Sequence, residues 1–157
     1  MTGLSPDAPK FRVWPPVALG IPWLAGFVLT VSLDDPFNLP ATETRVAAAV
    51  LLTAFVVWNG WTLAVMASNR TAILPGQATT RLLRTGPFRF SRNPLYIGLI
   101  ALDLGASLLW PSAWALLLVP FGVAILRWGA ISPEEHYLHD KFGAAYDEYR
   151  RQVRRWL

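Results

Sequence analysis

Rigid turn residues and arginines are concentrated in one short segment, Thr-Gly-Pro-Phe-Arg-Phe-Ser-Arg-Asn-Pro-Leu-Tyr-Ile-Gly, which runs from Thr85 to Gly98. A planar guanidinium binds a carboxylate or a phosphate through two parallel hydrogen bonds, and the turns would fix the direction of Arg92. Pro94 suits the first turn of a helix, and Gly98 one turn later permits close approach of a ligand or a backbone. The segment therefore predicts an anion-binding arginine at a helix start, and the alternative is an Arg92 that reaches out to lipid headgroups.

Two neighbouring carboxylates, Glu134 and Glu135, form the second cluster, within the sequence Ser-Pro-Glu-Glu-His-Tyr that starts at Ser132. Like charges this close repel each other, so a cation should compensate them, and Arg92, Arg127 or a cationic ligand could do so. A solvated helix start is the alternative, because a serine N-cap, a proline and acidic residues in the first turn are a favourable combination. The pair alone does not decide between these interpretations.

The composition indicates the environment in which these residues act. Hydrophobic residues make up 54% of the 157-residue chain and charged residues 15%. The charges lie in the first dozen residues, between Arg70 and Arg92, and after Arg127, and the segments between them are nearly free of charge. A bilayer imposes this segregation, so the sequence predicts an integral membrane protein.

Metal and nucleic-acid sites are not expected. Cysteine is absent and there are two histidines, which excludes a thiolate site and leaves too few ligands for a histidine cage. The net charge is +4, but the arginines flank apolar segments instead of forming one continuous basic patch. We therefore expect no metal and no nucleic-acid partner.

Four apolar runs must position the two clusters, at about 13–33, 45–67, 94–110 and 112–131. A helix of about 20 residues crosses the hydrocarbon core of a bilayer. Pro22 would kink the first run, for which a cleaved signal peptide is the alternative, although a clear cleavage site is missing. The short join between the third and fourth runs predicts an antiparallel hairpin, which would bring Arg92 and the acid pair together at one end.

The expected fold is an all-α integral membrane protein with about four transmembrane helices, in a single domain of residues 1–157. With four spans, the basic residues near the N-terminus, the arginines between the second and third runs, and the basic tail all lie on one side. The positive-inside tendency makes that side the cytoplasm, so we expect both termini there, in a bacterial inner membrane. Residues 132–157 form a polar, amphipathic tail that should fold as one or two helices against the cytoplasmic ends of the spans.

The two clusters together resemble the isoprenylcysteine carboxyl methyltransferase and phospholipid methyltransferase superfamily. The resemblance covers about Thr80 to the C-terminus and rests on an Arg-x-Pro-x-Tyr-x-Gly turn at Arg92 and on the pair at Glu134, one hairpin later. The pair begins the sequence Glu-Glu-His-Tyr-Leu-His-Asp-Lys-Phe-Gly-Ala-Ala-Tyr-Asp-Glu-Tyr, and Val-Arg-Arg-Trp follows near the terminus. These two motifs rarely occur together by chance, so the resemblance is specific.

In that family the two motifs enclose S-adenosylmethionine, which implies that the tail caps this cofactor. Many members have a histidine where this chain has Asn93, and an amide can replace a hydrogen bond but not a proton transfer. The resemblance implies the following cofactor-binding residues: Arg92, Asn93, Pro94, Tyr96, Gly98, Glu134 and Glu135.

Methyl transfer from a sulfonium requires alignment of donor and acceptor and exclusion of water. A carboxylate acceptor needs only Arg92 or Arg89 to orient it, whereas an amine or a thiol needs deprotonation by Glu134 or His136. The predicted catalytic residues are therefore Arg92, Glu134 and His136, and an ordinary interfacial histidine is the alternative for His136. The expected acceptor is lipid-like or small and hydrophobic, and reaches the site between the spans.

Two other functions remain open from the sequence. Sterol and lipid reductases share a similar Arg-x-Pro-x-Tyr-x-Gly turn, although this chain is short for one of them. A non-catalytic membrane scaffold is possible if the charged clusters only set topology and cap helices. Asp103 lies at membrane depth in the third run, where an acid usually faces a cavity or a partner, and it is either functional or part of a helix–helix hydrogen bond.

Overall fold

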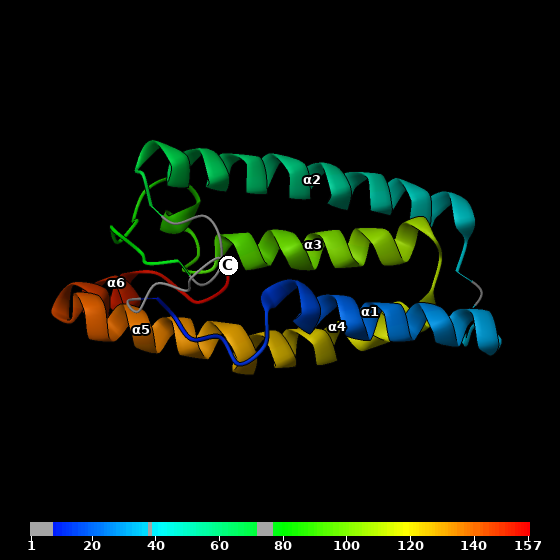
Figure 1. The fold of residues 1–157 in the computed structure, drawn as a ribbon. Helices are drawn as coiled ribbons and strands as arrows, with labels where there is room; N and C mark the ends of the chain where they lie inside the picture. The colour runs from blue at the N-terminus through cyan, green and yellow to red at the C-terminus, as the bar shows by residue number, and fades with distance from the viewer. Residues whose placement is uncertain (1–7, 38, 72–76) are drawn as a thin grey trace.

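The computed structural model describes residues 8–37, 39–71 and 77–157, and within them every regular element is a helix. Four helices form an antiparallel bundle (Figure 1): α1 (Pro15–Ser32), α2 (Ala41–Ser68), α3 (Pro94–Leu109) and α4 (Ala113–Leu126). One end, here called the polar end, carries a 3-10 turn, a π-helical turn and two further helices: η1 (Gly86–Arg89), η2 (Arg127–Ile131), α5 (Ser132–Phe142) and α6 (Ala144–Gln152). The all-α prediction is confirmed.

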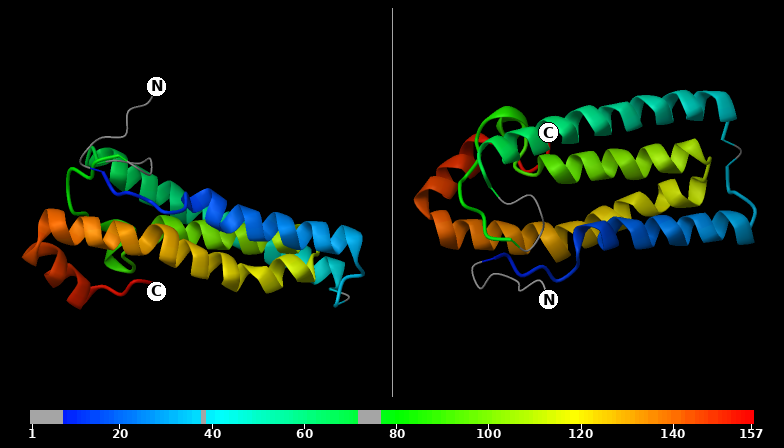
Figure 2. Two further views of the ribbon diagram at one scale, coloured as in Figure 1. Left: turned by 60° about the horizontal axis from the view of Figure 1, so that its bottom comes forward. Right: turned by 45° about the horizontal axis from the view of Figure 1, so that its top comes forward.

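The bundle consists of two helix pairs. α2 lies along α3 and α1 lies along α4, while smaller contacts between α1 and α3 and between α3 and α4 join the pairs (Figures 1 and 2). The join at residues 110–112 turns α3 directly back into α4, so the predicted hairpin is present. The residues before α3 and those after α4 therefore lie together at the polar end.

Hydrogen bonds tie the start of α4 to the end of α1, opposite the polar end. The carboxylate of Asp35 accepts the backbone N–H of Ala113 at 3.0 Å. The hydroxyl of Ser112 accepts the N–H of Ala115 at 3.0 Å and lies 2.6 Å from the hydroxyl of Thr30. A capping hydroxyl and a carboxylate at the helix N-terminus satisfy N–H groups that have no partner within the helix.

α4 does not end at residue 131, where the fourth run ends in the sequence. It continues through η2 into α5 as one helical stretch from Ala113 to Phe142. Ser132 has helical φ and ψ angles of −63° and −45° and does not serve as an N-cap. The expected alternative of a new helix start at Ser132 is therefore wrong.

The N-terminal segment explains how this helix passes a proline. Pro133 has no N–H to donate to the carbonyl of Gly129, four residues earlier. That carbonyl instead accepts the backbone N–H groups of Arg12 and Val13, at 2.8 and 3.1 Å. The segment before α1 thus replaces the helical hydrogen bond that the proline removes, and it is fixed against η2.

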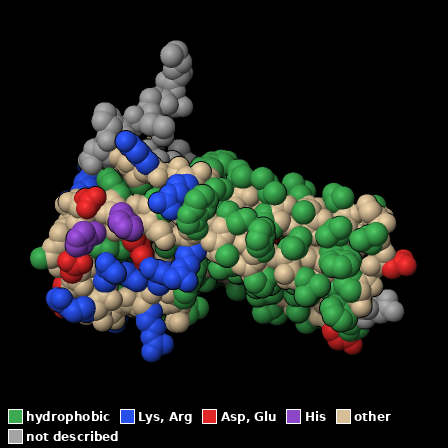
Figure 3. Space-filling view, turned by 90° about the horizontal axis from the view of Figure 1, so that it is seen from below, with side chains coloured by type: hydrophobic (Ala, Val, Ile, Leu, Met, Phe, Trp, Pro, Cys, Tyr) green, Lys and Arg blue, Asp and Glu red, His purple; other side chains and the backbone are tan. Residues whose placement is uncertain are grey.

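Three helical stretches are long and apolar enough to cross a membrane: Pro15–Ser32, Ala41–Ser68 and Ala113–Phe142. α3 is a shorter apolar helix of 16 residues, about 24 Å long, against roughly 30 Å for the hydrocarbon core of a bilayer. Hydrophobic side chains cover the body of the bundle, and basic side chains gather at the polar end (Figure 3). The structure therefore supports an integral membrane protein, whereas the count of four spans stays a prediction.

Gly26 marks a very close approach of α1 to α4, because a Cβ there would overlap the backbone of Ala115. We expect Gly26→Ala to destabilise the bundle by about 1–3 kcal/mol, since two packed helix backbones cannot move aside easily. Gly60→Ala is the matched control, because Gly60 also lies inside a long apolar helix but a Cβ there would meet nothing within 4 Å. Thermal unfolding of both variants in detergent measures the difference, and equal unfolding temperatures would contradict this packing.

Candidate functional site

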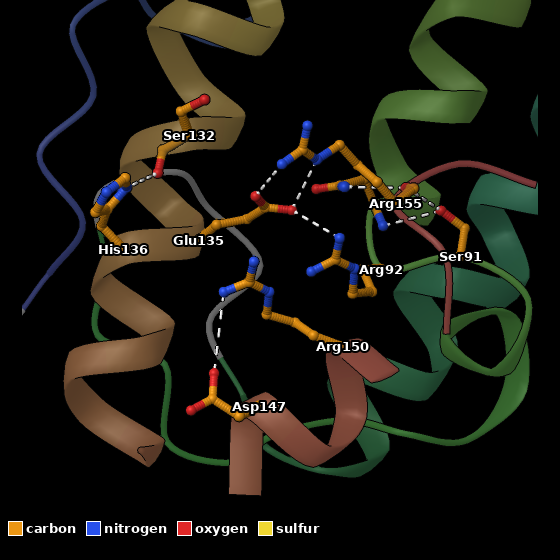
Figure 4. Close-up of polar contacts among 9 residues, drawn as sticks. Ser91, Arg92, Ser132, Glu135, His136, Asp147, Arg150 and Arg155 are labelled. Atoms are coloured by element: carbon orange, nitrogen blue, oxygen red, sulfur yellow. Dashed lines mark hydrogen bonds and ion pairs between the residues drawn. The ribbon is translucent and has the colours of Figure 1, made fainter. Parts of the chain in front are cut away.

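Arg92 and Glu135 form an ion pair at the polar end. Arg92 Nη2 lies 3.3 Å from Glu135 Oε1, and the two side chains are 10% and 11% exposed. Arg155, near the C-terminus, binds the same carboxylate through Nε at 3.0 Å and Nη2 at 2.6 Å. Figure 4 shows Glu135 between the two guanidinium groups. The two sequence clusters therefore meet in space, and a third basic residue joins them.

The C-terminal segment that follows α6 holds the turn before α3. The backbone N–H of Arg92 donates to the carbonyl of Arg154 at 2.9 Å. The carbonyl of Arg155 accepts the hydroxyl of Ser91 at 2.9 Å and the amide N–H of Asn93 at 3.1 Å. The position of Arg92 is thus fixed by contacts with residues about 60 positions away, and the amide of Asn93 contributes to this tie.

Tyr96 and Glu134 form a second contact between α3 and α5. The phenol of Tyr96 donates to Glu134 Oε2 at 2.6 Å, and Tyr96 is buried. The indole N–H of Trp58, on α2, donates to the carbonyl of Pro94 at 2.8 Å. The first turn of α3, which carries Tyr96, is therefore held by α2 on one side and by α5 on the other.

Gly98 provides space for a polar side chain from α2, because a Cβ at this position would overlap the amide group of Asn59. The Oδ1 atom of Asn59 is buried and has no hydrogen-bond partner among the described residues. Asn59 lines the cavity described next and Gly98 does not. The absence of a side chain at Gly98 thus leaves room for the amide group of Asn59.

A cavity of about 310 Å³, here called the polar cavity, lies between the N-terminal segment, α2, η1, α3 and α5. Five of the predicted site residues line it: Arg92, Asn93, Pro94, Tyr96 and Glu134. Much of the remaining wall is apolar or aromatic and includes Phe11, Trp14, Met66 and Phe88. The polar cavity therefore combines a cation, a carboxylate and aromatic rings.

Two residues that line this cavity also have buried polar atoms without a partner. Nε and Nη1 of Arg92 are buried and, like Oδ1 of Asn59, form no hydrogen bond within the described part of the chain. A buried polar group without a hydrogen bond costs about 1–3 kcal/mol. A guanidinium side chain and a carboxyl side chain in the wall of one cavity fit a small ligand that carries both a carboxylate and a positive charge.

His136 is not brought to this cavity. It is exposed on α5, its Nδ1 atom lies 2.7 Å from the carbonyl of Ser132, and it points away from the side of the helix that carries Glu135 (Figure 4). Arg89 is exposed as well and does not line the cavity. Glu135 does not line the cavity either, but it pairs with Arg92, which does.

Tyr146 and Tyr149, on α6, are buried beneath the ion pair, at 1% and 3% exposure. Burial raises the pKa of Tyr146 to about 12, and it also raises the pKa of Tyr149. The hydroxyl of Tyr149 donates to the carbonyl of Phe88 at 2.8 Å. Both rings are therefore neutral at physiological pH, and Tyr149 ties α6 to η1.

Asn59, Arg155 and Phe11 belong to the site but were not assigned to it from the sequence. Asn59 had a recognisable signal, since it is a strongly polar residue inside an apolar run. Arg155 lies in a basic tail whose charges indicate only the orientation of the chain in the membrane. Nothing in the spacing of residues along the sequence distinguishes Arg155 from Arg154. Phe11 reaches the polar cavity because its segment docks on η2, which is a contact between distant parts of the chain.

The model of the phospholipid methyltransferase family matches residues 44–145. A protein of Haemophilus influenzae, described as uncharacterized, is 35% identical over 63 residues, which are 40% of this chain and the whole of the relative. No solved structure matches the chain significantly. The matched residues include the ion-paired glutamate and all the predicted residues that line the polar cavity.

Glu135→Gln tests the contribution of the buried carboxylate. We expect the free energy of unfolding to fall by about 3 kcal/mol, because the neutral amide leaves two neighbouring guanidinium groups without a counter-ion. Glu148→Gln is the matched control, because Glu148 pairs with Arg151 on the exposed face of α6, and it should leave the unfolding temperature unchanged. Thermal unfolding in detergent compares the two, and an unaffected Glu135→Gln variant would contradict the network.

Proposed function

The chain belongs to the phospholipid methyltransferase family, and from this premise we propose that it is an S-adenosylmethionine-dependent methyltransferase that acts on a lipid-like or small hydrophobic acceptor. Membership of this family indicates a membrane methyltransferase. It does not favour the reductase or the scaffold alternatives. We further propose that the enzyme is similar to the isoprenylcysteine carboxyl methyltransferases, on the basis of the two motifs at the polar end.

One observation carries the proposal: Arg92 and Glu134, a guanidinium and a carboxyl side chain, line the same cavity. S-adenosylmethionine has an amino-acid end with a carboxylate and an ammonium, next to a sulfonium. A guanidinium is suited to the carboxylate, and a glutamate is suited to either positive group. The charges of Arg92 and Glu134 are therefore complementary to those of this cofactor.

The aromatic wall suits the rest of the cofactor. Phe11, Trp14 and Phe88 line the polar cavity beside Tyr96. Aromatic faces attract a nearby cation by about 0.5–2 kcal/mol and also stack against a purine ring. We therefore assign binding of the cofactor to Arg92, Glu134 and these rings, with Asn93 and Pro94 in the same wall.

When bound, the cofactor would supply an electrophilic methyl group that passes to the acceptor, with a neutral thioether as the leaving group. Arg92 orients a carboxylate, and the N-terminal segment lines the cavity and restricts water. For an amine or a thiol acceptor, Glu134 accepts the proton, and the phenol of Tyr96, 2.6 Å away, keeps its hydrogen bond to the carboxyl group and orients it. A catalytic role of His136 stays a prediction, and its exposed position gives it no contact with the cavity.

We place the polar end in the cytoplasm of a bacterial cell, with the bundle in the inner membrane. On the face drawn in Figure 3, Lys and Arg gather at the polar end together with some acidic side chains, whereas the charged side chains seen at the opposite end are acidic. Basic residues favour the cytoplasmic side of a membrane protein. The cofactor then enters from the cytoplasm, and the acceptor reaches the polar cavity from the bilayer.

Binding of radiolabelled S-adenosylmethionine to the detergent-purified protein tests the proposal. We expect saturable binding by the unaltered chain and a loss of affinity of about tenfold or more in Arg92→Gln, because a hydrogen bond to a charged group contributes about 1.5–3 kcal/mol. Arg81→Gln is the control, since Arg81 is exposed and does not line the cavity. It should bind like the unaltered protein.

Glu134→Gln provides a second variant in case Arg92→Gln fails to fold, because glutamine keeps the shape of the side chain and removes its charge. It should also weaken binding, and circular dichroism checks that the helices are intact. Absence of binding by the unaltered protein would contradict the proposed function. Unchanged affinity in both folded variants would contradict the site.

A further inference from the structure

A groove of about 450 Å³, here called the outer groove, lies along the helical stretch that runs from α4 through η2 into α5. Residues 120–132 of this stretch form most of its wall, and Trp156 of the C-terminal segment forms the rest. The outer groove shares no lining residue with the polar cavity. It is therefore a second candidate binding site, separate from the proposed methyltransferase site.

The wall of the outer groove changes from apolar to polar along the helix. Pro120, Val123 and Ala124 form its apolar part, and Arg127 and Ser132 follow toward the polar end. The first four of these residues recur at a spacing of three or four, so they lie on one face of the helix. The first and last lie about 18 Å apart along the helix axis. A molecule that fills the groove should therefore have an apolar body toward the middle of the bundle and a polar group at the polar end.

The side chains at the polar end of the groove offer hydrogen-bond donors. Arg127 is exposed, and its guanidinium group has no partner among the described residues. The hydroxyl of Ser132 and the indole N–H of Trp156 also form no hydrogen bond within the described chain, and neither atom is enclosed by protein. A guanidinium and an indole N–H donate and cannot accept. This set of groups therefore favours an anion with several acceptor oxygens, such as a phosphate.

A second cation borders the outer groove. Arg12 Cζ lies 5.3 Å from the centre of the Trp128 ring, and Trp128 lines the groove. No acidic side chain of the described chain lines it. An ammonium group on the ligand would find no carboxylate there and would meet two guanidinium groups, so the ligand should carry a net negative charge.

The surroundings of the groove identify the source of such a ligand. Leu117 and Phe121, also on α4, are 53% and 61% exposed, and the helical stretch is long and apolar enough to cross a membrane. Basic side chains lie beside the edge of the hydrophobic surface in Figure 3. Tryptophan and arginine are typical of the boundary between hydrocarbon and lipid headgroups. A molecule with an apolar body and a phosphate at this boundary is a phospholipid.

We propose that the outer groove binds an anionic phospholipid, whose phosphate accepts hydrogen bonds from Arg127, Ser132 and Trp156. One acyl chain follows the apolar part of the groove from Ala124 to Pro120. This lipid is bound at a site of its own and is not the methyl acceptor. The proposal therefore goes beyond the proposed methyltransferase function and does not depend on it.

The test uses the purified full chain, labelled with 5-fluorotryptophan, in phosphatidylcholine nanodiscs that contain increasing fractions of phosphatidylglycerol and no S-adenosylmethionine. The ¹⁹F resonance of Trp156 is assigned by its loss in Trp156→Phe. We expect a saturable shift of this resonance that is half complete at about one phosphatidylglycerol in six lipids. This value corresponds to an about fivefold preference for the anionic lipid, the contribution of one arginine near an anionic membrane surface.

Arg127→Gln should abolish the preference, so that half of the shift requires about one phosphatidylglycerol in two lipids. Arg81→Gln is the matched control, because it removes the same charge from an exposed residue that does not line the outer groove. It should behave like the unaltered protein. In each variant an unchanged circular dichroism spectrum checks that the helices are intact.

Three results would overturn the proposal. The first is a Trp156 resonance that does not respond to phosphatidylglycerol, or responds equally in the unaltered chain and in Arg127→Gln. The second is an equal loss of preference in Arg81→Gln, which would assign the effect to the general positive charge of the polar end. The third is the same shift on addition of inorganic phosphate to pure phosphatidylcholine nanodiscs, which would show a site for a free anion and not for a lipid.

Discussion

The carboxylate of Glu135, held between the guanidinium groups of Arg92 and Arg155, is the interaction on which the polar end depends. It joins the residue that enters α3, the helix that continues α4, and the C-terminal segment. A nearly buried charge is stable only if it is paired and hydrogen-bonded, and here both conditions are met from two sides. Glu135 pairs with one nitrogen of Arg92, and the other two are buried without a hydrogen-bond partner among the described residues.

A second constraint comes from the proline inside the long helix. Pro133 leaves the carbonyl of Gly129 free, and the N-terminal segment satisfies it with the N–H groups of Arg12 and Val13. A π-helical turn precedes this position, and such turns are often found at functional sites. The same contact brings Phe11 into the wall of the polar cavity, so one interaction both satisfies the helix at its proline and builds part of the aromatic wall.

The sequence was sufficient to predict the all-α class, the hairpin and the meeting of Arg92 with the acid pair, because each depends on patterns that are local or on one short connection. It did not reveal that Ser132 is helical, since the donors that make this possible lie about 120 residues earlier in the chain. Arg155 was missed because a basic tail has the same appearance whether its charges face lipid or a glutamate. Asn59 and Asp103 were visible as polar residues in apolar runs, but their neighbours depend on how the helices pack.

The central claim is that Arg92, Glu134 and Tyr96 surround the methyl donor in the polar cavity. Nuclear Overhauser contacts from the methyl group of S-[methyl-¹³C]adenosylmethionine, bound to the purified protein, test it most directly. The account predicts contacts with the ring protons of Tyr96 and with aromatic protons of the N-terminal segment. A bound methyl group that shows contacts only with residues outside the polar cavity would contradict it.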